Sequence, residues 1–269
     1  MNIIQSKDNT IIASIKKLKE KKYRNSEQKF IVEGFRFVSE ALESEFNVPM
    51  IFVSESQQER FDKFEISDKL QESTKVYWIE DKLFKTVCST ETPQGIAAVV
   101  ENRIVDLSTE DGLYVLVDGV QDPGNLGTII RTADAAGALG VILLKGTVDV
   151  YNDKTLRSTM GSIFHLPILE VKDFEALEKL ISSGFKLVVS SLGGENSFYN
   201  ENLKGKIIIA VGNEGNGVSD EILSRAATKV KIPMPGKAES LNVAIASSIM
   251  MFEYVRQNEK LEARCEKLE

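Results

Sequence analysis

The stretch VDGVQDPGNLGTIIRTADAAGA, residues 117–138, contains an apolar strand end, a loop rich in Gly, Pro, Asp and Asn, and the start of a helical pattern. Loops at the carboxyl ends of strands are where open α/β sheets bind ligands. Gly124 and Gly127 let the backbone approach a ligand closely. Asn125 can cap the helix, and Arg131 lies one to two turns inside it. Taken alone, this loop is also compatible with a capped turn and a surface arginine.

Two later loops have a similar character. The predicted strand 206–211 is followed by GNEGNG, residues 212–217, whose glycines permit unusual backbone torsions or close contact with a flat ligand, or form an ordinary strand-to-helix turn. In KIPMPGKAESLNVAIA, residues 231–246, two prolines fix the backbone and remove amide donors. Ser240 and Asn242 stand at the expected helix start, where each can cap the helix or hydrogen-bond a ligand without changing charge.

The three loops belong to a segment in which strands and helices alternate. This alternation predicts a parallel sheet with helices on both faces. Strands are expected at 113–117, 140–144, 186–190, 206–211 and 229–232, and helices near 126–137, 153–160, 173–183, 218–226 and 240–257. The last of these helices is apolar round much of its surface, so we expect it to be buried on more than one side and able to pack against a partner subunit.

The preceding residues predict a smaller α/β domain. Apolar residues from Asn9 to Lys22 recur at helical spacing and indicate one amphipathic first helix. Short β-rich runs follow at 30–34, 49–55, 76–80 and 95–100, separated by helical stretches at 36–44 and 58–70. We therefore expect a first domain at 1–103, a polar and acidic linker at 104–112, and a second domain at 113–269.

The net charge of −7 argues against a nucleic-acid partner, but the charge is unevenly distributed. Residues 1–30 hold eight Lys or Arg against three Asp or Glu, a local charge of +5. This pattern indicates either a nucleic-acid-binding arm or a plain solvated helical face. The candidate RNA-binding residues are Lys16, Lys17, Lys21, Lys22 and Arg24.

The scarcity of cysteine and histidine excludes several classes of site. Cys88 and Cys265 are far apart and lack CxxC spacing, which indicates a reducing compartment and neither a zinc nor a redox motif. His165, the only histidine, lies in an apolar stretch and is expected to be packed or hydrogen-bonded at the core edge. We expect no bound metal, no membrane segment and a cytoplasmic location.

In their order and separations, the three loops resemble the three motifs of SpoU/TrmH-type RNA 2'-O-ribose methyltransferases of the SPOUT superfamily. The resemblance covers about 150 residues, from Leu113 to Arg256, and LRSTMGSIFHLPI, residues 156–168, looks like the intermediate segment of that family. FIVEGFRFVSEAL, residues 30–42, is similar to the L30e-like RNA-binding extension of many members. The resemblance implies a second domain tied in a deep trefoil knot, and a homodimer.

The resemblance also implies the cofactor and the site. S-adenosylmethionine (AdoMet) is expected among the three loops, without a metal, and the substrate is expected to be structured RNA, ribosomal in preference to transfer RNA. The implied catalytic residues are Asn125, Arg131, Glu214, Ser240 and Asn242. The implied cofactor-binding residues are Ser191, Leu192, Gly193, Gly212, Asn213, Gly217, Ile232, Met234 and Leu241.

Two other functions are weighed against the methyltransferase. A non-catalytic RNA-binding or ribosome-assembly factor could keep the same fold as a scaffold, although polar residues are present in all three motifs. A Rossmann-type oxidoreductase would need a glycine fingerprint and a ribose-binding acid, neither of which can be placed in this sequence.

Overall fold

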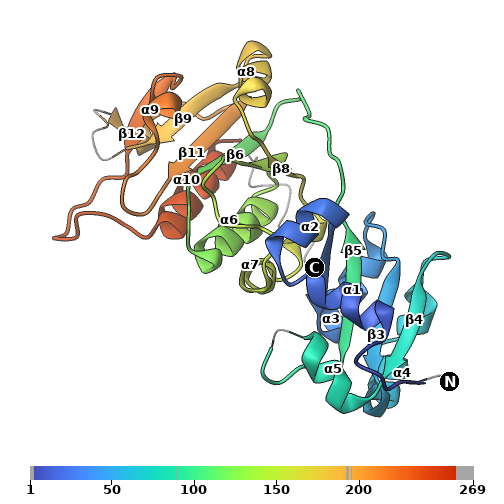
Figure 1. The fold of residues 1–269 in the computed structure, drawn as a ribbon. Coiled ribbons are helices and arrows are strands. Elements are labelled where there is room, and N and C mark those ends of the chain that lie inside the picture. The colour runs from blue at the N-terminus through green and yellow to red at the C-terminus, as the bar shows by residue number, and fades with distance from the viewer. Residues whose placement is uncertain (1–2, 89, 192–193, 195, 259–269) are drawn as a thin grey trace, which may run out of the picture. The chain divides into compact units, whose positions relative to one another are not determined.

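The computed structural model describes residues 3–88, 90–191, 194 and 196–258. The chain forms two compact units, which are drawn in Figure 1 and described separately below. Unit 1 contains Met1–Ile104 and Asp149–His165, and unit 2 contains Val105–Val148 and Leu166–Glu269. The segment Asp149–His165, which lies in the second half of the sequence, thus packs with the N-terminal part. The predicted division into functional domains at 1–103 and 113–269 stays a prediction.

The described part of unit 2 is built on a parallel sheet, as predicted. Its strand order is β10-β12-β9-β11-β6-β7-β8, and neighbouring strands in this order run parallel to each other. The strands are β6 (Leu113–Asp118), β7 (Gly140–Leu143), β8 (Ile168–Glu170), β9 (Lys186–Ser190), β10 (Asn196–Ser197), β11 (Ile207–Gly212) and β12 (Thr228–Lys231). The five predicted strands are confirmed. β8 and β10 have three and two residues, too few for a recognisable pattern.

Helices cover both faces of this sheet (Figure 1). They are α6 (Pro123–Ala135), α8 (Glu175–Ser182), α9 (Asp220–Leu223) and α10 (Val243–Asn258), with the 3-10 helix η4 (Phe198–Asn200). Alternate strand residues such as Leu116 and Ile208 share a buried cluster with Leu177 and Leu180 of α8 and Ile222 of α9. α10 packs against both α6 and β11.

The burial of α10 differs from the prediction. Its buried residues include Ala244, Ser247 and Met251. Ile245 and Phe252, in contrast, are about half exposed at 51% and 50%. Within a single copy of the protein, α10 is therefore buried on one side only. Because α10 is apolar round much of its surface, apolar side chains remain exposed on another side.

Unit 1 contains a five-stranded mixed sheet of order β1-β4-β3-β5-β2 among the described residues. Its strands are β1 (Ile3–Ile4), β2 (Lys29–Glu33), β3 (Met50–Ser54), β4 (Lys75–Ile79) and β5 (Ile96–Glu101), so the four predicted strands are confirmed. Its helical segments are α1 (Thr10–Lys17), α2 (Lys21–Glu27), α3 (Phe35–Glu43), η1 (Glu55–Gln57), α4 (Gln58–Lys63), η2 (Ile66–Lys69), α5 (Asp81–Val87), α7 (Asp153–Thr159) and η3 (Ser162–Phe164). α1 and α5 share one buried cluster, which includes Ile12, Ile15, Leu83 and Phe84.

Two helical predictions in unit 1 were wrong in detail. The first helix, predicted over 9–22, is divided into α1 and α2, and the guanidinium of Arg24 hydrogen-bonds the Leu18 and Lys19 carbonyls at the break. The stretch 58–70 is likewise divided into α4 and η2, because Glu65 adopts a left-handed conformation with φ of 52°. Each break interrupts a pattern that is continuous in the sequence.

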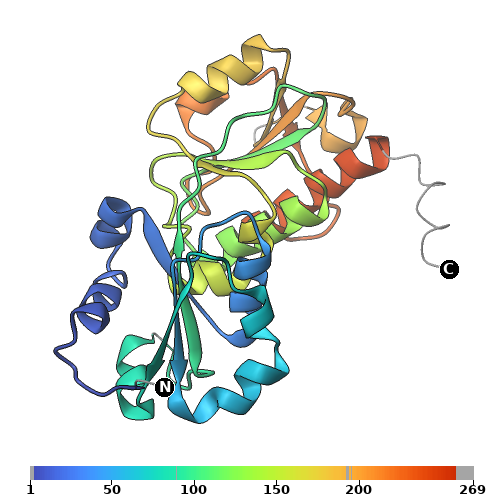
Figure 2. The same ribbon diagram turned by 90° about the vertical axis from the view of Figure 1, so that its right-hand side faces the viewer.

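The segment Asp149–His165 packs on β2 through aromatic side chains. The ring of Phe30 in β2 stacks on Tyr151 at 4.6 Å and on Phe164 at 6.5 Å between ring centroids. His165 ends this segment and is exposed, so the packed alternative of its prediction was wrong, whereas a hydrogen-bonded histidine at the core edge stays a prediction. The ribbon turned by 90° shows the same elements from a second direction (Figure 2).

Candidate active site

The candidate site lies at the carboxyl edge of the unit 2 sheet. β12, β9, β11 and β6 are consecutive neighbours and all parallel, so their carboxyl ends meet at one edge. The residues directly after β9 and β12 are Ser191 and Ile232, and Gly212 is the last residue of β11. The loop from Gly119 to Asp122 follows β6 at the same edge.

Three of the five predicted catalytic residues form one hydrogen-bonded chain. Nδ2 of Asn125 donates to Oε1 of Glu214 at 3.0 Å, and Nδ2 of Asn242 donates to Oδ1 of Asn125 at 2.9 Å. The three residues come from the three different loops identified in the sequence. The structure therefore places Asn125 at the centre of this chain.

Helix capping fixes two of these residues. Asp122 is the N-cap of α6, and its carboxylate accepts from the Asn125 amide at 2.8 Å. Asn125 thus lies inside the helix, and the prediction that it caps α6 was wrong. Asn242 caps α10, because its Oδ1 accepts from the Ala244 amide at 2.9 Å. Ser240 stands two residues before this cap.

Glu214 is held as a carboxylate by several donors. Its oxygens accept from the backbone amides of Gln121 at 3.3 Å and Asp122 at 3.4 Å, in addition to Asn125. Desolvation raises the pKa of Glu214, but hydrogen bonds from Asn125 and from the amides of Glu214 itself, Gln121 and Asp122 outweigh it. The net pKa of Glu214 is below its ordinary value of 4.5.

The glycine-rich loop after β11 needs its first glycine for close backbone packing. A Cβ on Gly212 would lie 2.1 Å from the backbone carbon of Gly217. Asn213 closes the loop, since its amide donates to the Gly217 carbonyl at 2.8 Å and its Oδ1 accepts from the Gly215 amide at 2.9 Å. Gly217 has a φ of +72°, a conformation that favours glycine.

Asp118 and Asp122 are two residues of the site that our sequence reasoning missed. The buried Asp118 ends β6 and accepts from the Ser219 amide at 2.7 Å, joining the β6 end to the start of α9. Nothing in the sequence distinguishes Asp118 from other polar strand ends. For Asp122, an Asp before Pro123 at the first helical position is a capping signal that could have been recognised.

In the described part of the structure, the other two predicted catalytic residues do not take part in the hydrogen-bonded chain of Asn242, Asn125 and Glu214. Arg131 has an exposed side chain on α6, and Ser240 is exposed in the loop before α10. Among residues 3–88, 90–191, 194 and 196–258, neither side chain hydrogen-bonds Asn125, Glu214 or Asn242. Both stay predictions.

The predicted cofactor-binding residues supply backbone polar groups and apolar side chains. The Ser191 amide donates to the Val230 carbonyl at 2.9 Å. Ile232 and Met234 are half-buried, and Leu241 is 37% exposed. Leu192 and Gly193 lie outside the described residues. Backbone polar groups beside apolar side chains are a set that fits an adenosine-containing ligand such as AdoMet.

The predicted RNA-binding residues divide into two groups. Lys17, Lys21 and Lys22 are exposed and Lys16 is half-buried. Arg24 is only 7% exposed and is ion-paired with Asp149. The prediction that Arg24 binds RNA is therefore corrected, because its guanidinium is occupied inside unit 1.

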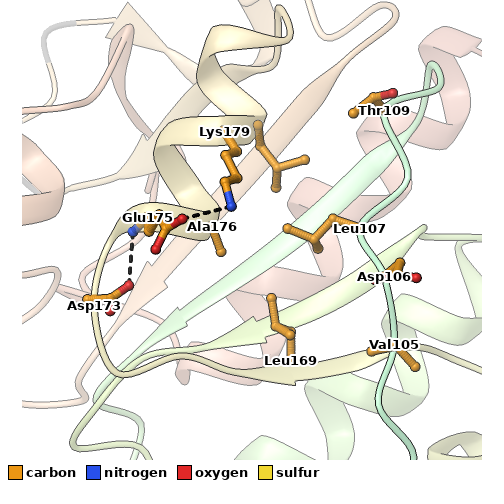
Figure 3. A pocket seen from close by; sticks show the side chains of 10 residues that line it. Val105, Asp106, Leu107, Thr109, Leu169, Asp173, Glu175, Ala176 and Lys179 are labelled. Carbon is orange, nitrogen blue, oxygen red and sulfur yellow. Dashed lines mark hydrogen bonds and ion pairs between the residues drawn. The ribbon is translucent and has the colours of Figure 1, made fainter.

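A pocket of about 450 Å³ lies elsewhere in unit 2, between the linker residues Val105–Thr109 and α8 (Figure 3). None of the predicted site residues lines it. Within the described part of the chain there is no group of three or more His, Cys, Asp and Glu side chains that could hold a metal ion. In the same part, no helix is both long and apolar enough to cross a membrane.

Comparisons with known proteins identify two matching families. Residues 112–252 match the SpoU rRNA Methylase family, and residues 9–98 match the MRM3-like substrate binding domain. A Bacillus subtilis protein named 23S rRNA (guanosine(2553)-2'-O)-methyltransferase RlmP is 38% identical over 252 residues, which cover 94% of this chain and 98% of that protein.

Solved structures give the same result. An AdoMet-bound rRNA methyltransferase from Sinorhizobium meliloti has a TM-score of 0.83 and 32% identity, covering 95% of this chain and 97% of its own. The SpoU methyltransferase AviRb from Streptomyces viridochromogenes, in complex with AdoMet, has a TM-score of 0.84 and 30% identity, covering 93% and 98%. These matches set aside the oxidoreductase hypothesis. The family match spans residues 112–252, more than half of the sequence, so the chain belongs to the SpoU rRNA methylase family.

Proposed function

We propose that this protein transfers a methyl group from AdoMet to a ribose 2'-hydroxyl of 23S-type ribosomal RNA. The observation that carries the proposal is the Asn242–Asn125–Glu214 chain at the carboxyl edge of the sheet, where the three family motifs meet. The B. subtilis relative is named for 2'-O-methylation of 23S rRNA. With ribosomal RNA as its substrate, the protein is expected to work in the cytoplasm.

The cofactor supplies a methyl group that its sulfonium already activates, so the protein's task is alignment and removal of one proton. The loops after β11 and β12 would hold AdoMet through backbone groups of Gly212, Ile232 and Leu241, and Ser191 after β9 would border the same pocket. Alignment of two reactants in one site lowers the barrier by removing the entropy of bringing them together. No metal is needed for this chemistry.

We assign Glu214 an orienting role. A carboxylate with a lowered pKa is a weak base, and Glu214 already accepts hydrogen bonds from Asn125 and two neighbouring amides. Its carboxylate sets the orientation of the Asn125 amide group, whose Oδ1 in turn accepts from Asn242. The 2'-hydroxyl proton is proposed to pass to solvent water.

We assign Arg131 a role in binding the RNA substrate. Its guanidinium is exposed on the same helix as Asn125, one to two turns further along. Because arginine stays protonated in proteins, it is a poor general base. It can anchor an RNA phosphate and stabilise the negative charge that develops on the 2'-oxygen. Ser240, exposed before the α10 cap, is proposed to contribute a neutral hydrogen bond.

We also propose a homodimer formed through α10. Ile245 and Phe252 lie two turns apart on one side of the helix, and both are about half exposed. Leu241, just before this helix, is a further exposed apolar side chain, and exposed apolar residues of this kind are typical of a subunit interface. Sedimentation of Phe252→Asp should show monomers where the unsubstituted protein shows dimers. The deep trefoil knot implied by the resemblance stays a prediction.

The test of the function uses an rRNA fragment and radiolabelled AdoMet. Once the methylated nucleotide has been mapped, a fragment with a single 2'-deoxyribose at that position should accept no methyl group and bind with little loss of affinity. Label on the deoxy fragment would refute 2'-O-transfer. Label on transfer RNA and not on ribosomal RNA would correct the substrate class. Calorimetry showing no AdoMet binding would favour a non-catalytic RNA-binding factor.

A further inference from the structure

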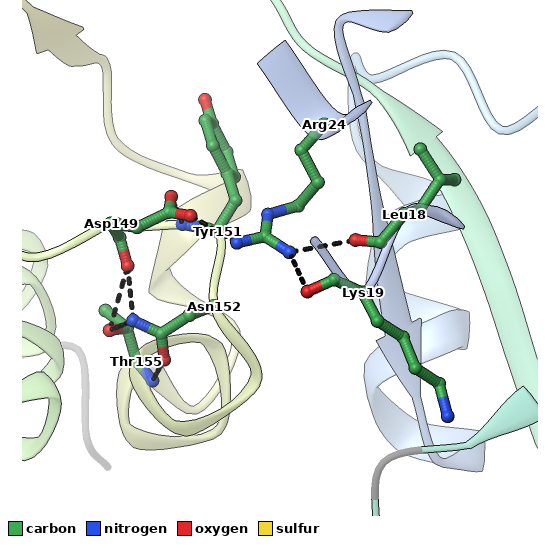
Figure 4. A network of polar contacts seen from close by, with 7 residues as sticks. All are labelled: Leu18, Lys19, Arg24, Asp149, Tyr151, Asn152 and Thr155. Atoms are coloured by element: carbon green, nitrogen blue, oxygen red, sulfur yellow. Dashed lines mark hydrogen bonds and ion pairs between the residues drawn. The ribbon is translucent and has the colours of Figure 1, made fainter. Parts of the chain in front are cut away.

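Arg24 is a buried cation that joins three parts of unit 1 (Figure 4). Its side chain is 9% exposed, and that of its partner Asp149 is 10% exposed. Nη1 donates to the carbonyl oxygens of Leu18 at 2.8 Å and Lys19 at 2.7 Å, and Nη2 is ion-paired with Oδ2 of Asp149. One guanidinium thus ties the turn between α1 and α2 to Asp149.

Asp149 in turn organises the start of α7. Its Oδ1 accepts from the Tyr151 amide at 3.0 Å, and its carbonyl accepts from Nδ2 of Asn152 at 2.6 Å. Asn152 is the N-cap of α7, where its Oδ1 accepts from the Thr155 amide at 2.9 Å. The Arg24 ion pair therefore holds a residue that itself orders the start of α7.

The residue before Asp149 belongs to the loop network of the candidate active site. The Val148 amide donates to the Val120 carbonyl at 2.9 Å, within unit 2. The next two residues after Val120, Gln121 and Asp122, donate their amides to Glu214. A single peptide bond, between residues 148 and 149, connects this network to the carboxylate that Arg24 binds.

We propose that Arg24 is a positioning residue that couples RNA binding to methyl transfer. RNA held by the exposed lysines of α1 and α2 is linked, through Arg24, Asp149 and the backbone at 148–149, to the loop that presents Asn125. The inference rests on the proposed function, because it presumes that RNA binds these lysines and is methylated at this site.

The physical argument depends on the geometry of the guanidinium. Three acceptors surround Arg24, and a planar fork with several fixed donors reaches them together, whereas the single ammonium of lysine cannot. Replacing a buried ion pair by apolar residues often changes stability little, so the best-attested use of such a pair is to specify one arrangement. Here the specified arrangement includes the lysine-bearing turn.

The experiment compares Arg24→Lys and Asp149→Asn with the unsubstituted full-length protein. Arg36→Lys is the matched control, because Arg36 is in an exposed ion pair of the same unit with Glu40. Single-turnover methylation at saturating rRNA fragment, RNA affinity at several salt concentrations, AdoMet calorimetry and thermal unfolding are measured for each variant. Hydroxyl-radical footprints on the RNA report how it is held.

We expect Arg24→Lys and Asp149→Asn each to slow single-turnover transfer by about tenfold or more. RNA affinity should stay within about threefold for both variants, and the salt slope of Arg24→Lys should be unchanged, because this substitution preserves the charge. AdoMet affinity should not change, and the footprint of both variants should lose definition. The double variant should be no slower than the slower single variant, since both break one link.

Two results would overturn the inference. Unchanged transfer rates with unchanged footprints would show that the link has no role in positioning. A fall in RNA affinity equal to the fall in rate, with an equal loss in thermal stability, would show that Arg24 only stabilises unit 1. If the unsubstituted protein binds RNA but methylates none, the proposed function fails by itself, and the footprints of the variants still decide the positioning role.

Discussion

Nδ2 of Asn125 donates to Oε1 of Glu214 at 3.0 Å, although the two residues are 89 positions apart in the chain. The same Asn125 accepts from Asn242, 117 positions further along the sequence. The side chain of Asn125 therefore uses both its donor and its acceptor to join the three motif loops. We expect the site to depend more on this amide than on either neighbour.

Asn125→Asp is the sharpest test of this arrangement. The substitution keeps the shape of the side chain but replaces the donor by a second carboxylate beside Glu214. Loss of one hydrogen bond to a charged group costs about 1.5–3 kcal/mol, so we expect methylation to slow by roughly ten- to a hundredfold. Single-turnover kinetics with bound AdoMet would measure the rate of methylation. A rate within twofold of that of the unsubstituted protein would show that the hydrogen bonds of Asn125 do not assist methyl transfer.

The pH dependence of methylation should not come from Glu214. Its pKa is below 4.5, so it is ionised throughout the range from about pH 6 to 9. Its contribution to stability is present above the ordinary pKa and is lost only as the pH falls through the lowered value. Glu214→Gln should therefore lower the rate without changing the shape of the pH–rate profile. Disappearance of a titration step in that variant would assign the general base to Glu214 instead.

Arg131→Lys should lose most of the rate. One ammonium cannot reproduce the planar fork that binds a phosphate and the developing alkoxide, and loss of such a donor costs about a hundredfold. AdoMet affinity should not change, because the predicted cofactor loops follow other strands. Arg36→Lys, at a position exposed on unit 1, is the control. Near-normal single-turnover transfer by Arg131→Lys would remove this residue from the mechanism.

Gly212→Ala should damage the cofactor loop. The added Cβ would lie 2.1 Å from the Gly217 backbone, so the loop has to move, at a cost of about 1–3 kcal/mol. We expect AdoMet affinity to fall by about tenfold or more and the melting temperature to fall. Gly215→Ala is the matched control, since a Cβ there would be 3.5 Å from Asn213 Oδ1. Equal AdoMet affinities for the two variants would argue against a tight loop at this site.

The lysines of α1 and α2 should contribute to RNA affinity by neutralising phosphates. Replacing Lys16, Lys17, Lys21 and Lys22 by Gln should weaken binding and reduce the salt slope by roughly 0.7–0.9 for each phosphate that the variant no longer neutralises. Cofactor affinity should stay the same. Replacement of Lys63, Lys75 and Lys82, which are exposed elsewhere on unit 1, is the control. An unaltered slope would show that α1 and α2 present an ordinary solvated surface.

Periodicity allowed much of the fold to be predicted. The strand 207–212 is a continuous apolar run because both faces of a central parallel strand are buried, and this pattern is visible without coordinates. Likewise, the loops after β6, β11 and β12 could be identified as parts of a site because Gly, Pro and Asn cluster there. Local composition thus determined the parallel sheet and the loops to be considered, and the resemblance to the SpoU/TrmH motifs supplied the individual residues.

Pairings between distant residues were decided by the tertiary structure alone. Arg24 is one of several basic residues in its segment, and only packing against Asp149, 125 positions away, removes it from the exposed set. The division of the first helix has the same origin, since the Arg24 donors that bind the Leu18 and Lys19 carbonyls at the break leave no periodic signal. The sequence determined which groups could form hydrogen bonds and ion pairs. The fold selected the partners, because a hydrogen bond depends on positions in space that separation along the chain does not encode.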